Sequence, residues 1–442
     1  MPENTTQPIS ESFVQQLWAE EIFQNPLVTL AGEKIQILQS GFRNHQAGPD
    51  FLHACIVNEK GIPETGAVEI HLEPQSWDMH GHRLDPRYEN VILHVVWDCG
   101  TKEYFSRTSE NRYVRQVELK NQLPWPLASL RTIFHNTPEC EETSSIREGE
   151  CASWIGAWED ARVLEILENA GHYRFRKKTS LWQMRANVWG AEQALWTGIA
   201  EALGYSANKE AFRALAQRVK IADLLNISLQ GQREALLLGM AGFLPDKILP
   251  RDHQHVRRLW DFWWKERSEK EIFILPKNIW RFTGVRPQNR PEKRIAALSL
   301  LSERRAWNAL LQKIEKGDTK NIRDQLLAFS HPFWNHRFSF RSSVQSSKSG
   351  LIGDERIQAM LFNIVLPFCN RAALNDEMLK KLAPAPYSQK LRFISKRLLG
   401  KRRIALTRLA QEGLLQIHEN ICAHYHHQCA QCDFLKNDAH AI

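Results

Sequence analysis

The chain has 442 residues, and this length predicts two or three domains rather than a single compact unit. Its composition, 43% hydrophobic and 24% charged, is that of an ordinary soluble protein, and no apolar run approaches the ~20 residues that a membrane span requires. The net charge of +8 is unevenly spread: residues 1–120 carry 10 Lys and Arg against 17 Asp and Glu, or −7, so the remainder carries 48 against 33, or +15.

Short apolar runs separated by turn-forming residues predict an α/β arrangement for the first 120 residues. Residues 11–24 place Phe13, Leu17 and Ile22 at helical intervals, with Ser12 as the candidate cap, and predict an amphipathic helix. The polar segment 75–90 is expected to form a loop or short helix that holds His80 and His82 over a sheet. Strands are predicted at residues 34–39, 51–57, 67–72 and 91–97, with a further strand pair within 104–119.

The predicted domain boundary is a proline-containing stretch, residues 123–138, followed by the polar residues 141–150. Beyond it, apolar residues recur at i, i+3 and i+4, which predicts helices. We therefore expect an α+β protein with an α/β domain in residues 1–138 and a mainly α-helical region in residues 151–442. Helices are expected at residues 154–170, 193–203, 209–219, 232–240, 256–265, 291–311, 355–368 and 391–415.

The first candidate site consists of Asp50, Glu69 and His71. Side chains alternate along a strand, so Glu69 and His71 are expected on one face, beside Asp50 at the start of the neighbouring strand. Carboxylates suit a hard divalent cation, which makes Asp50 and Glu69 predicted ligands of Mg²⁺ or Mn²⁺. The alternative is an exposed polar edge that binds nothing.

Two further histidines belong to this prediction. His82 or His94 could protonate a leaving oxygen, or could ligate a softer ion such as Zn²⁺, which prefers imidazole. His94 lies within an apolar run, and this position also fits a hydrogen-bonded core histidine.

The second candidate site consists of Cys422, Cys429 and Cys432. The N-terminus lacks a secretory signal pattern, so we expect a reducing, cytoplasmic location, where clustered thiols indicate metal binding rather than disulfides. The C-x2-C spacing lets two thiolates reach one ion. The fourth ligand stays open: a histidine among His424, His426 and His427 would complete a zinc site, whereas Cys140 or Cys151 would permit an iron–sulfur cluster.

The third feature is basic. Residues 387–408 contain eight Lys or Arg and no acid, and residues 172–178 and four arginines between 281 and 294 add similar patches. Such a run is either a solvated face or a match for a polyanion, so nucleic acid is the expected partner. The predicted nucleic-acid-binding residues are Arg392, Lys396, Arg397, Lys401, Arg402 and Arg403.

Several blocks of this sequence resemble a bacterial family called domain of unknown function 2851. They are residues 48–51 (GPDF), 68–71 (VEIH), the His80/His82 pair and 92–96 (ILHVV), and they continue through 231–244 and 281–296. The resemblance runs through nearly the whole chain. It implies that these blocks belong together and supplies no activity.

The order of the N-terminal elements is also similar to that of the PD-(D/E)XK nuclease superfamily. This resemblance implies a restriction-endonuclease-like α/β domain with a mixed central sheet. Pro49-Asp50 matches the first acidic ligand of that pattern and Glu69 the second, and Glu20 or Glu21 would match the acid that some members carry on the first helix. His71 stands where the pattern has lysine, and a neutral imidazole supplies no fixed cation.

The nuclease resemblance implies metal-assisted hydrolysis of phosphodiester bonds, with His71 deprotonating a water activated by ions on Asp50 and Glu69. Two alternatives stay open. One is a non-catalytic nucleic-acid-binding protein on a degenerate nuclease scaffold, and the other is a zinc-dependent hydrolase of another substrate. No P-loop, dinucleotide-binding glycine motif or serine-hydrolase elbow occurs, so those enzyme classes have little support.

Overall fold

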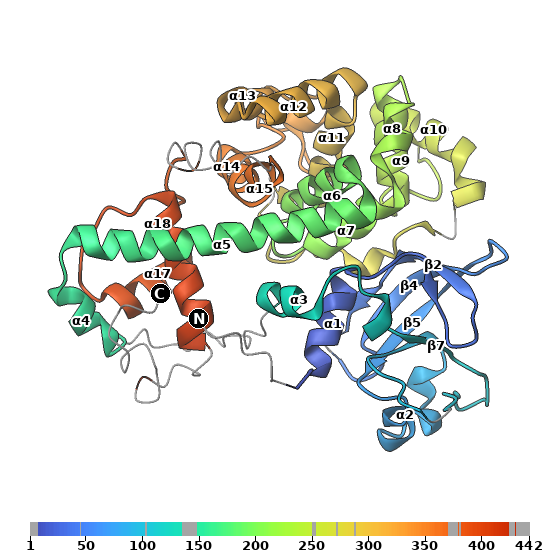
Figure 1. Cartoon of the computed structure of the whole chain (residues 1–442). Coiled ribbons are helices and arrows are strands. Elements are labelled where there is room, and N and C mark those ends of the chain that lie inside the picture. Colours follow the sequence, from blue (N-terminus) through green and yellow to red (C-terminus); the bar gives the residue numbers. More distant parts are fainter. Residues whose placement is uncertain are drawn as a thin grey trace.

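The computed structural model describes residues 8–44, 46–101, 104–134, 148–249, 253–270, 273–286, 289–369 and 382–423, together with 379 and 429. The chain is an α+β protein, as predicted. Residues 8–134, here called the sheet region, contain a mixed sheet. Residues 148–423 form a helical region (Figure 1). Much of the predicted domain boundary falls on residues 135–147, which lie outside the described residues.

Within the described part of the chain, seven strands form one sheet in the order β1-β2-β4-β5-β6-β7, with β3 paired to β4. The pairs from β1 to β5 are antiparallel, whereas β5–β6 and β6–β7 are parallel. The strands span Leu27–Val28 (β1), Lys34–Gln39 (β2), Phe42–Arg43 (β3), Phe51–Val57 (β4), Pro63–His71 (β5), Val91–Val96 (β6) and Arg115–Glu118 (β7). Between β6 and β7, residues 107 and 113 form an isolated bridge in place of the predicted strand pair.

One face of the sheet packs against helix α1 (Glu11–Ala19). The helix is capped by Ser10, whose side chain accepts a hydrogen bond from the backbone N–H of Phe13, and not by Ser12. Its buried side chains share a core with Val68 and Ile70 of β5, and α3 (Leu127–Ile133) closes the same core. Because side chains alternate along a strand, Glu69 and His71 project from the opposite face.

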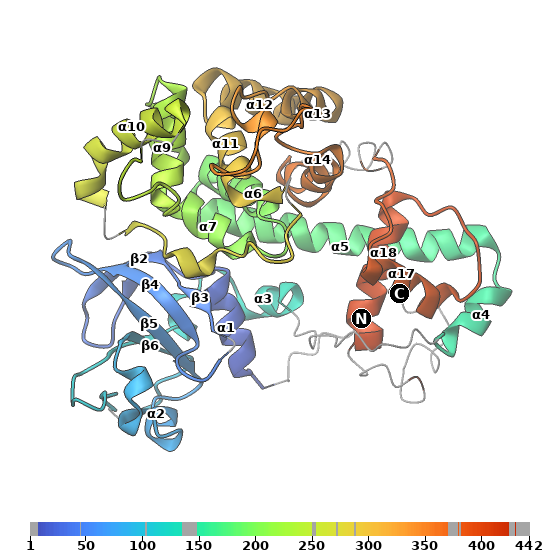
Figure 2. The same cartoon turned by 180° about the vertical axis from the view of Figure 1, so that it is seen from behind.

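The helical region is organised around α5 (Asp160–Trp189), a 30-residue helix about 45 Å long. In Figures 1 and 2 it runs from α4 (Cys151–Ala157) at one end to a central bundle at the other. Across the described residues, every helix is too short or too polar to serve as a membrane span. The bundle helices are α6 (Ala191–Leu203), α7 (Lys209–Arg218), α8 (Ile221–Leu225), α9 (Gln230–Met240), α10 (Gln254–Lys270), α11 (Pro291–Leu301), α12 (Arg304–Lys316), α13 (Thr319–Leu327), α14 (Asp354–Met360) and α15 (Leu366–Phe368).

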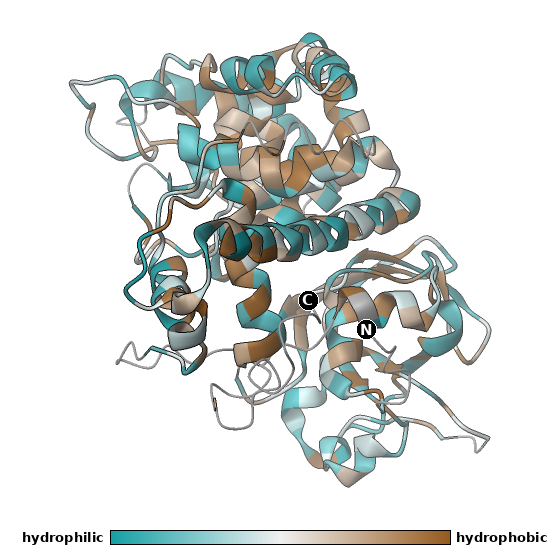
Figure 3. Cartoon of the chain, turned by 60° about the vertical axis from the view of Figure 1, so that its left-hand side comes forward, coloured by the Kyte–Doolittle hydropathy of each residue, from teal (hydrophilic) through white to brown (hydrophobic). Residues whose placement is uncertain are grey.

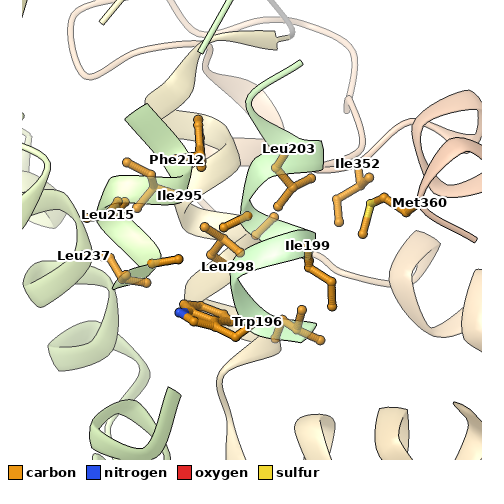
Figure 4. Packing of buried hydrophobic residues seen from close by; sticks show 14 of the residues in the cluster. Trp196, Ile199, Leu203, Phe212, Leu215, Leu237, Ile295, Leu298, Ile352 and Met360 are labelled. Atoms are coloured by element: carbon orange, nitrogen blue, oxygen red, sulfur yellow. The ribbon is translucent and has the colours of Figure 1, made fainter. Parts of the chain in front are cut away.

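The largest hydrophobic core lies inside the central bundle. Figure 3 shows hydrophobic residues on its inner helices and hydrophilic residues on the outer ones. In Figure 4, Trp196 and Leu203 of α6 face side chains from α7, α9 and α11. The side chains labelled there are Trp196, Ile199, Leu203, Phe212, Leu215, Leu237, Ile295, Leu298, Ile352 and Met360.

A smaller core joins α4 and the first half of α5 to α17 (Gln389–Leu399), α18 (Arg408–Ile417) and η9 (His418–Ala423). We call this group the C-terminal bundle. Its core includes Cys151, Ile394, Leu398, Leu414 and Cys422. The long α5 therefore links two separate hydrophobic cores.

Three helices predicted as single are each divided. The predicted helix 154–170 separates into α4 and α5 at residues 158–159. The predicted helix 291–311 breaks where the side chain of Glu303 caps α12 by accepting from the backbone N–H of Ala306. The predicted helix 391–415 ends at Gly400, which has φ 58°, and restarts at the cap Thr407.

Buried ion pairs join the sheet region to the central bundle. Glu20, at the end of α1, pairs with Arg185 of α5 and Arg213 of α7, and both arginines also pair with Glu201 of α6. Next to this network lies a cavity of about 600 Å³ between α1, α7 and the ends of β2 and β3. Its lining includes Ser12, Gln39, Phe42, Arg43, Arg213 and Gln217.

Candidate metal centre

Strands β5 and β6 place three polar side chains on the face of the sheet that α1 does not cover. In the parallel register Glu69 lies beside His94, and His71 follows two residues further along the same strand. All three are buried, with at most 5% of each residue exposed. The predicted same-face arrangement of Glu69 and His71 is therefore present.

The connector between β5 and β6 covers this face. It consists of α2 (Ser76–Met79), η1 (His82–Leu84) and η2 (Pro86–Tyr88), and it is anchored by the buried rings of Trp77 and Tyr88. The ring of Tyr88 stacks on His82 at 3.8 Å between centroids. Gly81, with φ 75°, makes the turn between His80 and His82. The connector thus brings two histidines down onto the strands.

Nitrogen atoms of three histidines come together there, and Glu69 contacts two of them. Oε1 of Glu69 lies 3.1 Å from Nε2 of His82 and 3.5 Å from Nε2 of His71. Nε2 of His71 lies 3.1 Å from Nδ1 of His80, and nitrogen atoms of the three histidines all lie within 4.8 Å of one another. Despite its short distance to Glu69, Nε2 of His82 is buried and makes no hydrogen bond.

Asp50 lies at the edge of the same group, just before β4. Its Oδ1 accepts a hydrogen bond from Nε2 of Gln15 at 2.9 Å, and its Oδ2 accepts one from the backbone N–H of Ile70 at 2.9 Å. Its own backbone N–H donates to Oε2 of Glu69 at 3.0 Å. These bonds fix the Glu69 carboxylate with its other oxygen, Oε1, directed at the histidines.

Behind the ligands, a buried chain of hydrogen bonds orients His71. Nδ1 of His71 lies 2.9 Å from Nε2 of His94, and Nδ1 of His94 lies 2.7 Å from Oγ of Ser106. Nε2 of Gln116 donates to the same hydroxyl at 3.1 Å. If His71 and His94 each carry the proton on Nδ1, the chain is satisfied, and Nε2 of His71 presents its lone pair toward His80, as a second partner fixes the free nitrogen of histidine in many metal sites. Both ring nitrogens of His94 are thus engaged, one by His71 and the other by Ser106.

The pKa shifts of the residues in this group are compatible with a bound cation. Burial raises the pKa of Glu69 to about 8 and, together with the nearby Glu69 carboxylate, the pKa of Asp50 to about 7. Burial lowers the pKa of His71 to about 3 and also lowers the pKa values of His82 and His94. Neutral imidazoles are the form that binds metals, and buried carboxyls of raised pKa are stabilised as anions by an added cation.

The acid on the first helix is not the predicted one. Glu20 pairs with two arginines at the junction with the helical region, and Glu21 accepts hydrogen bonds from Ser40 and Gln217. Glu11, one residue into α1, faces the site instead: burial and the nearby Asp50 raise its pKa, and Gln15 bridges the two acids. Sequence reasoning also left His80 without a role, although its place beside His82 was the available signal.

The predicted basic surface is only partly exposed. Arg392, Lys396, Lys401 and Arg403 are exposed. Arg397 is buried, and one guanidinium N–H donates to Sγ of Cys429, while Arg402 binds the carbonyl oxygens of Ile155 and Trp158 and the carboxylate of Asp160. The donors of these two arginines are used inside the protein, and the other four residues form the exposed part of the predicted surface.

Two cations of the basic run at residues 172–178 are likewise used inside the protein, whereas Arg176 is exposed. Arg174 and Lys178 both pair with the buried Glu412 at 3.0 Å, and Arg174 also pairs with Glu419. These cations join α5 to α18 and are not available to a polyanion.

Of the predicted cysteine site, Cys422 and Cys429 are described, and both lie near α17 in the C-terminal bundle. Cys432, Cys140 and the candidate histidines at 424, 426 and 427 lie outside the described residues. Cys151, named as one alternative for the fourth ligand, is buried in the same core as Cys422.

A second group of metal-ligand type lies in the central bundle, around the fully buried Glu234. Oε1 lies 3.0 Å from Nε2 of His255 and accepts from Nε1 of Trp334, and Oε2 lies 3.1 Å from Nε2 of His331 and accepts from Gln230. Nδ1 of His331 accepts from two backbone N–H groups, which places the proton of the neutral ring on Nε2. Glu234 is thus saturated by N–H donors, and His331 offers no lone pair.

Comparison with known proteins identifies the family but not an activity. A family model described as "Protein of unknown function (DUF2851)" matches residues 11–383, which include the whole candidate site and end before α17. No curated protein and no solved structure matches the chain. The match covers most of the sequence, so the chain belongs to the DUF2851 family, as its sequence blocks predict.

Proposed function

We propose that this protein is a metal-dependent nuclease that hydrolyses phosphodiester bonds of DNA or RNA. The proposal rests above all on the grouping of His71, His80 and His82 beside Glu69, where Nε2 of His82 makes no hydrogen bond. Such a set of one carboxylate and three imidazoles has the ligand number and the polarity of a transition-metal site.

The ligand types indicate which ion the site would take. Imidazole nitrogen suits Zn²⁺ and other transition metals, whereas Mg²⁺ prefers an all-oxygen shell that keeps several waters. Of the two ions expected from the sequence, Mn²⁺ therefore fits better than Mg²⁺, and Zn²⁺ joins it as a candidate. A bound ion would polarise a phosphodiester and lower the pKa of a water molecule.

The other side chains of the site then have separate roles in the proposed reaction. His71 serves as a ligand rather than as the predicted base, because its Nε2 faces His80 and Glu69 while its Nδ1 is held by His94. Asp50 is the carboxylate left to accept a proton from the attacking water, and Gln15 and the backbone of residue 70 hold it in place. His80 is exposed and marks the side from which a substrate would approach.

The topology of the sheet supports the phosphodiester assignment. Strands β2, β4 and β5 form an antiparallel meander, and β6 returns parallel to β5 after a connector. This order, with Asp50 opening one strand and Glu69 inside the next, is similar to that of PD-(D/E)XK nucleases. Histidine in place of the usual lysine then adds a ligand to the metal instead of a fixed charge.

A short nucleic acid would not reach both the exposed basic residues of α17 and the candidate site. In Figures 1 and 2, α17 lies on the opposite side of the molecule from α2 and the sheet. Arg43, which lines the cavity between α1 and α7, lies closer to the site, because it donates to Oε1 of Gln15, and Nε2 of Gln15 donates to Asp50. Near the site, Arg43 would thus bind the phosphate backbone. The exposed basic residues of α17 would contact only long substrates.

The three-histidine ligand set also supports a second candidate function, a zinc-dependent hydrolase of another substrate. Both functions need the same ligands, and they differ in substrate and in the preferred ion.

The test is cleavage of single- and double-stranded DNA and RNA with Mn²⁺, Zn²⁺ or Mg²⁺. We expect Mn²⁺-dependent cleavage by the wild type and a loss of about 1,000-fold or more in Asp50→Asn and Glu69→Gln. The matched control is His53→Asn, which changes an exposed histidine on β4 at φ 59°, a backbone conformation that asparagine tolerates. Unchanged cleavage in both acidic variants would refute the proposal, and metal-dependent hydrolysis of other esters without cleavage of nucleic acid would select the second candidate.

A further inference from the structure

The cavity between the sheet region and the central bundle has the size of a small-molecule site. Its volume of about 600 Å³ falls within the roughly 300–1,000 Å³ of pockets that bind small ligands. One wall consists of residues 39–43, where β2 ends and the chain turns into β3, and another comes from α7 (Figures 1 and 2). None of the described residues that line it belongs to the Glu69 and histidine group, so the cavity is separate from the candidate metal centre.

Gln39 is a buried residue of the cavity wall whose amide has no partner. It lies on the buried face of β2, and only 2% of the residue is exposed. Neither Oε1 nor Nε2 makes a hydrogen bond within the described part of the chain. Burying an unpaired amide costs free energy, so packing alone does not explain a glutamine at this position. A ligand with one donor and one acceptor would satisfy both atoms.

The amide of Gln39 can turn toward such a ligand at low cost. Both of its polar atoms are shielded from solvent within the wall, so a ligand would meet them after the side chain rotates. The terminal torsion of a glutamine side chain is broad, and here no hydrogen bond opposes the rotation. Gly41, with φ 99°, makes the turn that brings β2 and β3 to the same wall.

The same turn supplies a cation and an aromatic ring. Arg43 lines the cavity, makes no ion pair with a described residue, and donates from Nη2 to Oε1 of Gln15 at 3.2 Å. Phe42 is partly buried beside it in the wall. On the α7 side, by contrast, the charge of Arg213 is balanced by two glutamates. An uncompensated cation, an aromatic ring and a free amide are groups that bind the phosphate, the ring and the polar edge of a nucleotide.

We propose that this cavity binds an adenine nucleotide, with Gln39 paired to the base, Phe42 against its ring and Arg43 on its phosphate. The amide of glutamine donates and accepts along one edge, and this edge matches N7 and the N6 amino group of adenine, as in the recognition of adenine in DNA. The same chemistry would recognise a free adenine nucleotide or an adenine within a strand. The site goes beyond the proposed function, because it needs neither the metal ligands nor hydrolysis.

Two hydrogen bonds connect this site to the candidate metal centre. Arg43 donates to Gln15, and Nε2 of Gln15 donates to Oδ1 of Asp50 at 2.9 Å. A strand whose phosphate lies on Arg43 would therefore pass close to Asp50, and an adenine turned out of that strand would enter the cavity. This use in cleavage rests on the proposed function, whereas binding of the nucleotide does not.

The experiment is calorimetric titration of the full-length protein with AMP in the presence of a chelator, so that metal binding plays no part. We expect one AMP per chain, bound more tightly than GMP or CMP. Gln39→Met keeps the length of the side chain and removes the amide, so it should weaken the binding of AMP by about tenfold or more. The matched control is Gln36→Met, which changes an exposed glutamine of the same strand and should bind AMP as the wild type does. No binding of AMP, or equal binding by the two variants, would overturn the proposal.

The phosphate contact has a separate test. Arg43→Gln should weaken the binding of AMP by about tenfold and leave the binding of adenosine, which lacks the phosphate, unchanged. Equal weakening of both ligands would overturn the placement of the phosphate on Arg43.

Short oligonucleotides distinguish the two sources of the nucleotide. A dT strand with one central dA is compared with an all-dT strand, again in the presence of a chelator. Tighter binding of the strand that contains dA, lost in Gln39→Met, assigns the site to an adenine within a strand. Binding of AMP without such a preference assigns it to the free nucleotide, and either result supports the proposal.

A second measurement keeps the proposal falsifiable if Gln39→Met does not fold. Photolabelling of the wild type with an azido derivative of AMP, followed by peptide mapping, should mark residues 39–43 or α7. Labels confined to other parts of the chain would overturn the proposal. Because the amide of Gln39 has no partner to lose, Gln39→Met should also unfold at a temperature no lower than that of the wild type.

Discussion

Two glutamates of this protein are each surrounded by histidines, and the two groups differ in how their carboxylates are hydrogen-bonded. Around Glu234 every contact is an N–H donor, from His255, His331, Trp334 and Gln230. Around Glu69 the hydrogen bond from the protein comes from one backbone N–H, and the facing nitrogen of His82 makes none. The extent of hydrogen bonding to the carboxylate, rather than the number of histidines, distinguishes the two groups.

The difference predicts opposite consequences for the two carboxylates. Glu234 has a strongly lowered pKa because its donors outweigh the cost of its burial, so the anion stabilises the fold. Glu69 has a raised pKa because burial is not compensated, so its charge costs stability until a cation arrives. A carboxylate that destabilises the fold is the expected mark of a functional site.

The largest effect is expected from Glu234→Ala. The change leaves Trp334, Gln230 and two histidines without an acceptor in the core of the central bundle, and we expect a loss of about 3–5 kcal/mol in the free energy of unfolding. Urea denaturation monitored by tryptophan fluorescence measures it. Affinity for Mn²⁺ should not change. A variant as stable as the wild type would show that the Glu234 site is not the structural one of the pair.

A second buried carboxylate, that of Glu412, is also surrounded by hydrogen-bond donors, and it predicts how the stability of the fold depends on pH. Glu412 pairs with Arg174, Lys178 and Arg408, and these cations lower its pKa to about 2 against the cost of burial. Since the folded pKa lies below the unfolded one, its contribution is full above about pH 5 and is lost as the pH falls toward 2. The loss is about 3 kcal/mol in the free energy of unfolding, from the lowering of the pKa.

Unfolding followed between pH 6 and pH 2 tests this contribution. Glu412→Gln should be less stable than the wild type at pH 6 and should lose less stability on acidification. Parallel acid profiles for the two proteins would contradict the assignment.

The supporting chain behind His71 predicts a smaller effect. Ser106→Ala removes the hydroxyl that contacts Nδ1 of His94, so the tautomer and orientation of His71 are no longer fixed. We expect affinity for Mn²⁺ to fall by about 10–100-fold, as is typical when the hydrogen-bond partner that orients a metal-binding histidine is removed. Ser109→Ala is the matched control, because Ser109 lies in the same loop and contacts Glu89 instead. Equal Mn²⁺ affinities of Ser106→Ala and Ser109→Ala would show that the hydrogen bonds of His94 do not support metal binding.

The smallest effect has the opposite sign. Glu69→Gln replaces a buried, uncompensated acid by a neutral amide of the same shape, so metal-free protein should gain about 1 kcal/mol in stability at pH 8. Thermal unfolding in the presence of a chelator measures the gain. A loss of stability would place Glu69 with Glu234 among the structural carboxylates.

The sheet was largely predictable from sequence and the helix ends were not. Strands β2 and β4 have the predicted bounds, because alternating apolar residues and flanking glycines define them. Helices α11 and α12 were predicted as one, since their apolar spacing continues across Ser302, and the cap at Glu303 is a weaker signal than the spacing. The second half of α5 was missed because its polar residues are paired internally.

The part of the candidate site that lies on strands was predictable from the sequence. Strand periodicity places Glu69 and His71 on one face, whereas the helix could not tell Glu11 from Glu20, because which turn of α1 meets Asp50 depends on packing. The connector that delivers His80 and His82 is irregular, so its path cannot be read from a period. The inward turn of Arg397 and Arg402 likewise depends on tertiary contacts.

Calorimetric titration with Mn²⁺ tests the central claim most directly, because thiolates take this ion poorly. The wild type and His255→Ala should bind one ion in the sheet region with equal affinity, and His82→Ala should bind it more than about 100-fold more weakly. Wild-type protein that binds no Mn²⁺, or equal losses in His82→Ala and His255→Ala, would contradict the assignment of the metal site to Glu69 and its three histidines.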